Sequence, residues 1–299
     1  MVLPIRVPSQ PVSLIPLMKG AQQVTLIGDH KQLPAVIKSD LAKREQLHIS
    51  LFERLIKTSA AKSVLLDTQY RMRPAISAFP NESFYHSALQ DAPSVSSRPP
   101  APLSKYLALE PDAGSIAFVK HDGPEQFLKN SLQNPDEADV IVDLVGDLLL
   151  RNPTLDARDI GVVSPYFAQT RLLQDRFAFL AADRLEPLLG RQRAADLQLV
   201  EVNTVDAFQG REKAVVVLST VRNNPQGRIG FLTDQRRLNV ALTRAKDALF
   251  VVGNEQTLRM ATRSDWQEEQ ADSDSGVWRR YLRWMDERGR VVGANYKKW

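Results

Sequence analysis

The chain has 299 residues, of which 43% are hydrophobic, so it is long enough for one large domain or two ordinary ones with a real core. Its net charge of +4 is mildly basic, which permits a nucleic-acid partner without requiring one. The absence of cysteine excludes a disulfide scaffold and a thiolate metal site, and the 4 histidines are scattered singly, so we expect no metal site.

The first twenty residues are apolar, but four prolines interrupt them. They contain no unbroken apolar run of about 20 residues, as a membrane span requires. No basic cluster precedes a clean apolar run, so a signal peptide is not indicated either. We therefore expect no membrane partner and a cytoplasmic or nuclear location.

Seven short apolar runs alternate with helical patterns along the chain. The predicted strands cover 23–28, 63–67, 115–119, 160–164, 198–202, 214–221 and 248–253, and the predicted helices cover 50–60, 135–151, 167–181, 236–246 and 276–291. The runs are continuous rather than alternating, which is typical of strands buried on both faces of a parallel sheet. The order predicts an α/β fold, a parallel sheet flanked by helices.

Polar segments follow several of these strands, and ligands bind at the carboxyl ends of strands in such a sheet. The segments are DHKQLPAV, TQYRMRP, PYFAQ, NTVDAFQGREK and RRLNVALTRAK. Arginine is the preferred planar partner of phosphate. The pattern therefore predicts a polyphosphate site first and a nucleic-acid track second.

The segment 236–246 reads as one helix in which Arg237 and Arg244 are seven residues apart and project from nearly the same side. From the residues alone, a surface salt bridge explains each arginine as well as a functional role does. We expect Arg237 to be structural.

The segments GDHKQLPAV, LLDTQYRMRP, VNTVDAFQGREK and RRLNVALTRAK, in this order, resemble motifs III to VI of superfamily 1B helicases. The nearest group is that of the nonsense-mediated-decay (up-frameshift) helicases, and the resemblance runs from about residue 12 to about 255. It implies a RecA-like P-loop NTPase fold. Residues 1–60 would be the remnant of a first RecA-like domain, 61–258 the second RecA-like domain, and 259–299 a C-terminal helical tail.

The resemblance also implies roles in catalysis for three residues. Gln32 would sense the γ-phosphate of ATP and couple it to nucleic acid. Arg71 and Arg244 would reach the γ-phosphate as arginine fingers, which stabilise charge during phosphoryl transfer.

Further residues are implied to bind nucleotide and nucleic acid. Tyr70 would lie near the base, Gly210 would let the backbone approach the nucleotide, and Glu212 would bind the ribose. The face that binds single-stranded RNA or DNA would be lined by Ser164, Pro165, Tyr166 and Thr204.

Residues 136–139 spell DEAD, the Walker B sequence of a different helicase superfamily. There the acids end an apolar strand, whereas here they precede an amphipathic helix. Asn134, Pro135 and Glu137 instead fit an N-cap, a first-turn proline and a capping-box acid.

The chain contains no GxxxxGK[ST] sequence and no apolar strand that ends in Asp-Glu. We therefore expect ATP and Mg²⁺ to serve the full helicase without being held stably by this chain alone. Its partner would be the missing first RecA-like domain, in cis or in trans. An apolar interface around 13–20 and 24–28 would then be exposed.

Three hypotheses remain open at this point. The chain is the C-terminal part of an ATP-dependent helicase, a non-catalytic protein that binds single-stranded nucleic acid, or an interaction module that completes another chain. RNA and DNA are not distinguished, because contacts to phosphates and base faces accept both.

Overall fold

The computed structural model describes residues 2–3, 10–20, 22–59, 61–107, 115–261 and 276–294. The chain divides into two compact units, Met1–Asp67 and Thr68–Trp299. None of the described helices combines the length and the apolar content needed to cross a bilayer.

The first unit contains two short parallel strands and three helices. Its elements are β1 (Val2–Leu3), α1 (Gln10–Leu17), β2 (Thr25–Leu26), α2 (Asp40–Arg44) and α3 (Leu51–Lys57). Helix α3 begins after Ser50, whose side chain accepts a hydrogen bond from the backbone N–H of Glu53 at 3.0 Å, as an N-cap does.

The apolar side chains of α1 and the β2 region are largely exposed, as predicted. Ile15 is 60% exposed and Met18 is 85% exposed, and Val24 and Ile27 are also exposed. Apolar side chains gathered in this way mark an interaction site more often than an ordinary surface.

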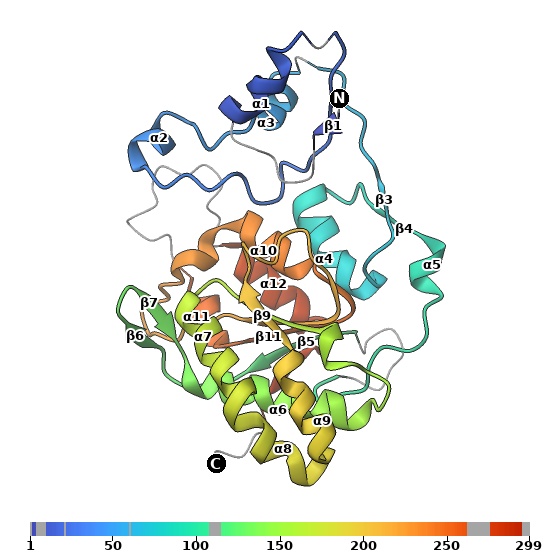
Figure 1. The fold of residues 1–299 in the computed structure, drawn as a ribbon, viewed down its shortest axis with the longest axis vertical. Helices are drawn as coiled ribbons and strands as arrows, with labels where there is room; N and C mark the ends of the chain where they lie inside the picture. Colours follow the sequence, from blue (N-terminus) through green and yellow to red (C-terminus); the bar gives the residue numbers. More distant parts are fainter. Residues whose placement is uncertain are drawn as a thin grey trace. The chain divides into compact units, whose positions relative to one another are not determined.

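The second unit is built around one large sheet (Figure 1). The strands of this unit, in the large sheet and in two small pairs, are β3 (Thr68–Gln69), β4 (Gln90–Asp91), β5 (Ile116–Lys120), β6 (Gln126–Leu128), β7 (Ser131–Gln133), β8 (Ile160–Ser164), β9 (Glu201–Thr204), β10 (Lys213–Ser219), β11 (Ala245–Gly253) and β12 (Val291–Gly293). Its helices are α4 (Pro74–Tyr85), α5 (Pro93–Ser96), α6 (Pro135–Arg151), α7 (Phe167–Asp175), α8 (Ala181–Leu189), α9 (Arg191–Ala195), α10 (Gln235–Leu242), α11 (Glu255–Arg259) and α12 (Gly276–Asp286).

The large sheet has six strands in the order β12-β5-β11-β10-β8-β9, and every pair in it is parallel. All five residues of β8 are buried, and only the ends of β5, β10 and β11 are not. The predicted α/β fold with a parallel sheet flanked by helices is thus confirmed.

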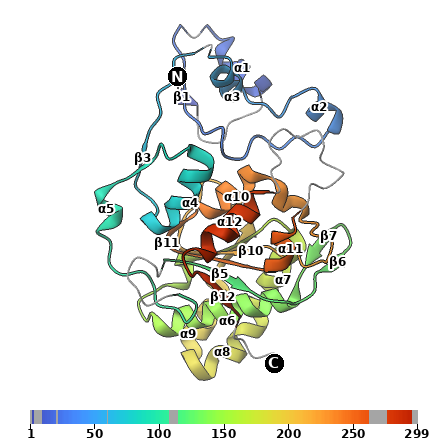
Figure 2. The ribbon, with the colours of Figure 1, turned by 180° about the vertical axis from the view of Figure 1, so that it is seen from behind.

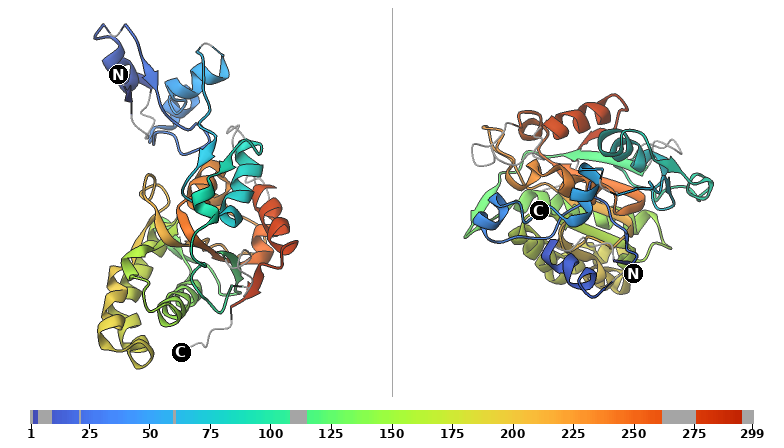
Figure 3. Two further views of the ribbon diagram at one scale, coloured as in Figure 1. Left: turned by 90° about the vertical axis from the view of Figure 1, so that its right-hand side faces the viewer. Right: turned by 90° about the horizontal axis from the view of Figure 1, so that it is seen from above.

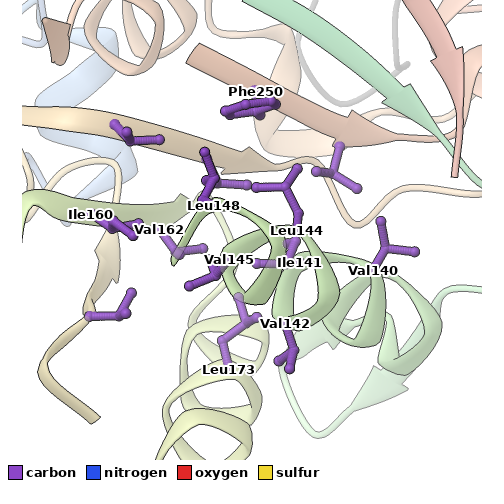
Figure 4. Packing of buried hydrophobic residues seen from close by; sticks show 14 of the residues in the cluster. Val140, Ile141, Val142, Leu144, Val145, Leu148, Ile160, Val162, Leu173 and Phe250 are labelled. Carbon is purple, nitrogen blue, oxygen red and sulfur yellow. The ribbon is translucent and has the colours of Figure 1, made fainter. Parts of the chain in front are cut away.

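Helices cover both faces of this sheet (Figures 2 and 3). Helices α6, α7 and α8 lie on one face, and α4, α10 and α12 lie on the other. On the first face, α6 sends Leu144 and Leu148 toward Phe250 of β11 (Figure 4). These side chains are completely buried, and each contributes roughly 1.5–3 kcal/mol of hydrophobic stabilisation.

Helix α6 begins as predicted from its sequence, but Glu137, the predicted capping-box acid, has another role. Asn134 caps the helix by accepting from the N–H of Glu137 at 3.0 Å, and Pro135 occupies the first turn. The Glu137 carboxylate does not complete a capping box. It is fully buried, contacts His121 Nε2 at 2.8 Å and accepts from the Val221 N–H at 3.0 Å.

Two predicted strands are misplaced. No strand forms at 63–67, where Val64 and Leu66 are about 80% exposed, and pairing starts only at β3. An apolar run becomes a strand only where a partner strand is available. The run 198–202 begins as a 3₁₀ turn, Asp196–Leu199, and β9 follows it two residues later.

The chain between 236 and 246 is not one helix. Helix α10 ends at Leu242, and the hydroxyl of Thr243 satisfies the carbonyl of Asn239 in the last turn at 2.8 Å. Strand β11 then begins at Ala245, which pairs with Lys213. Arg237 and Arg244 therefore do not project from the same side of one helix.

The C-terminal helix ends earlier than predicted. Helix α12 stops at Asp286, and Val291–Gly293 form the edge strand β12. The helical spacing of Trp278, Tyr281, Leu282 and Met285 predicts that they pack the tail down, and all four are buried. The mixed charge of 183–196 predicts a loop or a short exposed helix, and these residues belong mostly to α8 and α9. The Pro-, Ser- and Ala-rich stretch 91–114, expected to be a surface loop or excursion between two strands, contains α5, and 108–114 lie outside the described residues.

Candidate nucleotide site and nucleic-acid face

Glu212 joins two cations from distant parts of the second unit. Its carboxylate lies 2.6 Å from Arg71 Nε and 2.8 Å from Lys246 Nζ, with each cation on a different oxygen. The hydrogen bonds from Lys246 and Arg71 lower the pKa of Glu212 to about 2, although partial burial acts in the opposite direction. Glu212 is therefore ionised throughout the neutral range.

Arg71 and Arg244 meet at Thr243. Arg71 Nη1 donates to the Thr243 carbonyl at 3.1 Å, and Arg244 Nη2 contacts the Thr243 hydroxyl at 2.9 Å. Arg244 is only 2% exposed and its Nε donates to the carbonyl of Val240 at 3.0 Å. The structure thus brings together two arginines that are 173 positions apart in the sequence (71 and 244).

Tyr70 lies beside this group and is exposed, with 68% of its surface accessible. Arg98 fixes the backbone here, donating to the carbonyl of Arg71 at 2.6 Å and to that of Tyr70 at 3.1 Å. Sequence reasoning missed Arg98, because it lies in a Pro- and Ser-rich stretch that carries no motif. It also missed Lys246, although this residue ends the ALTRAK sequence.

Gly210 ends the turn that follows β9 and has a φ of +83°, a conformation that favours glycine. The same turn is anchored by Phe208, which is fully buried. A Cβ atom at Gly161 of β8 would lie 2.7 Å from the Phe208 ring, so the sheet leaves space for this ring. Phe208 therefore fixes the turn that carries Gly210 and Glu212.

Gln32 belongs to the other unit, Met1–Asp67. Its side-chain amide donates to Asp29 Oδ2 at 3.0 Å, while the N–H of Lys31 donates to Asp29 Oδ1 at 2.9 Å. Asp29 thus organises the turn after β2 and holds Gln32 in one orientation. The role of Gln32 in sensing phosphate remains a prediction.

The predicted nucleic-acid residues lie at the carboxyl ends of two neighbouring strands, β8 and β9, where Ser164 pairs in register with Thr204. Ser164 and Tyr166 are buried, and Pro165 and Thr204 are partly buried. The Ser164 hydroxyl accepts from the N–H of Tyr166 at 3.3 Å, and the Thr204 hydroxyl accepts from the N–H of Ala207 at 3.2 Å. Their contact with nucleic acid remains a prediction.

Two further residues hold Tyr166 in place. Arg222 donates to the Tyr166 hydroxyl at 3.3 Å and forms an ion pair with Glu125 at 2.9 Å. The Tyr166 hydroxyl itself donates to the carbonyl of Ile229 at 3.2 Å. Burial raises the pKa of Tyr166, so its hydroxyl keeps its proton. Arg222 directly follows the predicted strand 214–221 and lies three residues after the end of β10, and this position near a carboxyl end was the signal that could have identified it.

Arg237 has a structural role, in agreement with its interpretation from the sequence. It forms two parallel hydrogen bonds with the carboxylate of Asp206, at 2.9 and 3.1 Å. Burial acts to lower the pKa of Arg237, but Asp206 outweighs it and the pKa is raised. The pair connects the start of α10 to the turn after β9.

A family model described as an AAA domain matches residues 47–256, and a second model with the same description matches residues 9–40. The chain is 37% identical to Probable helicase MAGATAMA 3 of Arabidopsis thaliana over 254 residues, which are 84% of this chain and 29% of that protein. It is 40% identical to ATP-dependent helicase NAM7 of Saccharomyces cerevisiae over 258 residues, 85% of this chain and 25% of that protein.

A third similar protein is Regulator of nonsense transcripts 1 homolog of Arabidopsis thaliana. The identity is 38% over 252 residues, which are 84% of this chain and 19% of that protein. The chain therefore spans less than a third of the length of each of these three relatives.

Proposed function

Because the chain belongs to the superfamily 1 helicases of the up-frameshift-like group, we propose that it supplies the second RecA-like domain of an ATP-driven helicase acting on single-stranded RNA or DNA. The proposal includes the arginine fingers of the ATP site and one face of the nucleic-acid track. Its relatives are named as helicases or as a regulator of nonsense transcripts, and these names support helicase activity as the class of function.

The observation that carries the proposal is the joint contact of Arg71 and Arg244 with Thr243, next to the ionised Glu212. The two guanidinium groups lie at the amino ends of β10 and β11, not at the carboxyl ends where the sequence pattern predicted the phosphate site. Two arginines side by side nevertheless suit the oxygens of a polyphosphate. In this proposal they stabilise the charge that develops when ATP is cleaved, Glu212 holds the ribose, Gly210 admits the nucleotide to the backbone and Tyr70 lies near the base.

The remaining part of the ATP site comes from a P-loop domain, in cis or in trans. The sequence holds no GxxxxGK[ST] motif, and the described residues contain no group of three His, Asp or Glu side chains that could hold a metal ion. Bound magnesium would neutralise phosphate charge, and its protein ligands belong to that domain. The exposed Ile15 and Met18 of the first unit support an apolar contact with it. Alone, the chain should not turn over ATP.

The test is to fuse the chain behind the P-loop domain of one of its relatives and to measure phosphate release with and without single-stranded nucleic acid. The fusion should hydrolyse ATP, whereas the 299-residue chain should not. Arg244→Ala should lower the turnover by about 10³ or more while a fluorescent ATP analogue still binds. The matched control is Arg279→Ala, which removes an exposed arginine of α12 and should change neither quantity.

Turnover by Arg244→Ala close to that of the unchanged fusion would exclude the arginine-finger role. Because Arg244 is buried, the thermal midpoint of each variant must be measured as well. Arg71→Ala offers a second test, because Arg71 is more exposed and its replacement leaves α10 intact.

A further inference from the structure

Exposed phenylalanines gather around the buried Tyr166. The ring of Phe231 packs against that of Tyr166 with centroids 5.5 Å apart, yet it is 53% exposed. Phe167 follows Tyr166 directly, begins α7 and is 66% exposed. Large apolar side chains that remain in water next to one another mark a binding surface more often than chance.

A third phenylalanine reaches the same region from the hairpin β6–β7. Phe127 is paired in register with Leu132, and directly opposed residues lie on the same face of an antiparallel pair. Leu132 is buried in a small cluster with Tyr166 and Val221. Phe127 therefore stands on the face of the hairpin that turns toward Tyr166, although it is 81% exposed.

The hairpin is fixed in this position. The hydroxyl of Ser131 on β7 accepts a hydrogen bond from the N–H of Ala168, in the first turn of α7, at 3.1 Å. Figures 1 and 2 both show β6 and β7 beside α7 and α11. Phe127 and Phe167 are thus carried by two elements that this hydrogen bond holds together.

Positive charge lies among these rings. Lys129 is at the hairpin turn, Arg171 is four residues after Phe167 on α7, and Arg228 closely precedes Phe231. All three are exposed, and none forms an ion pair with a described residue. Side chains at i and i+4 share one face of a helix, so Arg171 extends the surface that starts at Phe167. Cations interleaved with aromatic rings match the phosphates and bases of a single strand.

We propose that these three phenylalanines form a stacking surface for bases of single-stranded nucleic acid, and that the three cations hold its phosphates. The inference rests on the proposed function and extends it. The predicted residues Ser164 and Tyr166 are buried and shape the surface from beneath, whereas the phenylalanine rings make the contact. Any base can stack on a ring, so the surface accepts RNA and DNA of any sequence.

The experiment measures binding of the 299-residue chain to fluorescent 12-nucleotide strands, poly(U) and poly(dT), by anisotropy. A third strand has the same backbone but no bases. Phe127→Ala and Phe167→Ala should each weaken binding to the strands with bases by about fivefold or more. Neither variant should change the binding of the abasic strand, which should already be weaker for the unchanged chain.

The chain offers a matched control in Phe179, which is 73% exposed but lies in the helical turn Arg176–Leu180, away from the hairpin in sequence and in contacts. Phe179→Ala should bind every strand as the unchanged chain does. Phe127→Trp should retain binding, because a larger ring also stacks.

The outcomes separate the two proposals. If neither the unchanged chain nor its fusion with the P-loop domain binds either strand, the proposed nucleic-acid function is wrong. If it binds both, but Phe127→Ala and Phe167→Ala bind as Phe179→Ala does, the stacking surface is wrong and the proposed function stands. An equal loss on the abasic strand would likewise overturn stacking, because only the backbone would then be held.

Discussion

At the scale of single residues, Glu212 links two segments that are distant in the sequence. Its two carboxylate oxygens bind residues 71 and 246, which arrive from a loop before α4 and from the start of β11. In both ion pairs the side chain of Glu212 is about 40% exposed, so each pair contributes only about 0.2–1 kcal/mol to the free energy of unfolding. Their larger effect is to hold Arg71 in one orientation.

We predict that Glu212→Gln lowers the free energy of unfolding by about 1 kcal/mol at pH 7, because two ion pairs are lost. The pKa of Glu212 lies at about 2 in the folded chain and near 4.5 in the unfolded chain. The contribution of the carboxylate is therefore fully present above pH 4.5 and is lost as the pH falls toward 2. Urea unfolding at pH 7, 4 and 3 measures this.

The control for this prediction is Glu186→Gln, an exposed acid of α8. It should leave both the stability and its pH dependence unchanged. The same change in the free energy of unfolding between pH 7 and 3 in Glu212→Gln and in the unchanged chain would show that Glu212 does not contribute in this way.

At the scale of elements, the start of α6 is a junction of three segments. The side-chain amide of Asn134 donates to the carbonyls of Gly123 and Val221, at 2.8 and 3.1 Å, while its oxygen caps the helix. The Val221 N–H donates to Glu137, and Val221 has a φ of +69°, which is strained for a β-branched residue. The helix start thus fixes the loop after β10, and with it Arg222 beneath Tyr166.

We predict that Asn134→Ala lowers the free energy of unfolding by about 2 kcal/mol or more, measured by urea denaturation. The cap contributes about 1 kcal/mol, and the buried carbonyl of Val221 loses its donor, whereas that of Gly123 keeps the amide of Asn223. Asp156→Ala removes the exposed cap of the 3₁₀ turn Ala157–Asp159 and should lower it by less than half as much. Equal decreases in the free energy of unfolding of the two variants would contradict the role of Asn134 in joining these segments.

Local chemistry explains what could be predicted from the sequence. Asn134 and Pro135 identify the start of α6, because a cap acts on its own next residues. The role of Glu137 could not be predicted, since its partners Ser219 and Val221 are 82 and 84 residues away. Likewise, the pattern of 236–246 contains no signal that Thr243 ends the helix, because strand pairing with β10 decides this.

The candidate site follows the same rule. The motifs predicted Arg71, Glu212 and Arg244, and the structure brings these three together around Thr243. Of their two supports, Arg98 lies in a stretch that carries no motif, whereas Lys246 ends the ALTRAK sequence and was overlooked. The exposure of the phenylalanines around Tyr166 is also a tertiary property that spacing does not reveal.

At the scale of the whole molecule, the chain is two compact units that join at residues 67 and 68. The stretch before the junction has no regular structure, and its apolar side chains at 64–66 are between 59% and 80% exposed. Exposed backbone outside helices and strands is where proteases cut first.

We predict that brief chymotrypsin treatment cleaves after Leu65 or Leu66 and leaves a resistant fragment that begins near Thr68. Mass spectrometry of the fragment identifies the cut. A first cut within 115–261, where the large sheet lies, would contradict the division into two units. Leu66→Lys should reduce cleavage at this position without changing the thermal midpoint of the second unit.

The fixed length of helix α10 couples the residues at its two ends. It has eight residues and is therefore about 12 Å long. Near its first turn Arg237 is attached to Asp206, two residues beyond Thr204, and just past its last turn Thr243 is attached to Arg71 and Arg244. A helix can tilt or translate but hardly shortens. A displacement of the turn that carries Asp206 should therefore be passed along α10 to Thr243, Arg71 and Arg244 rather than be absorbed by the helix.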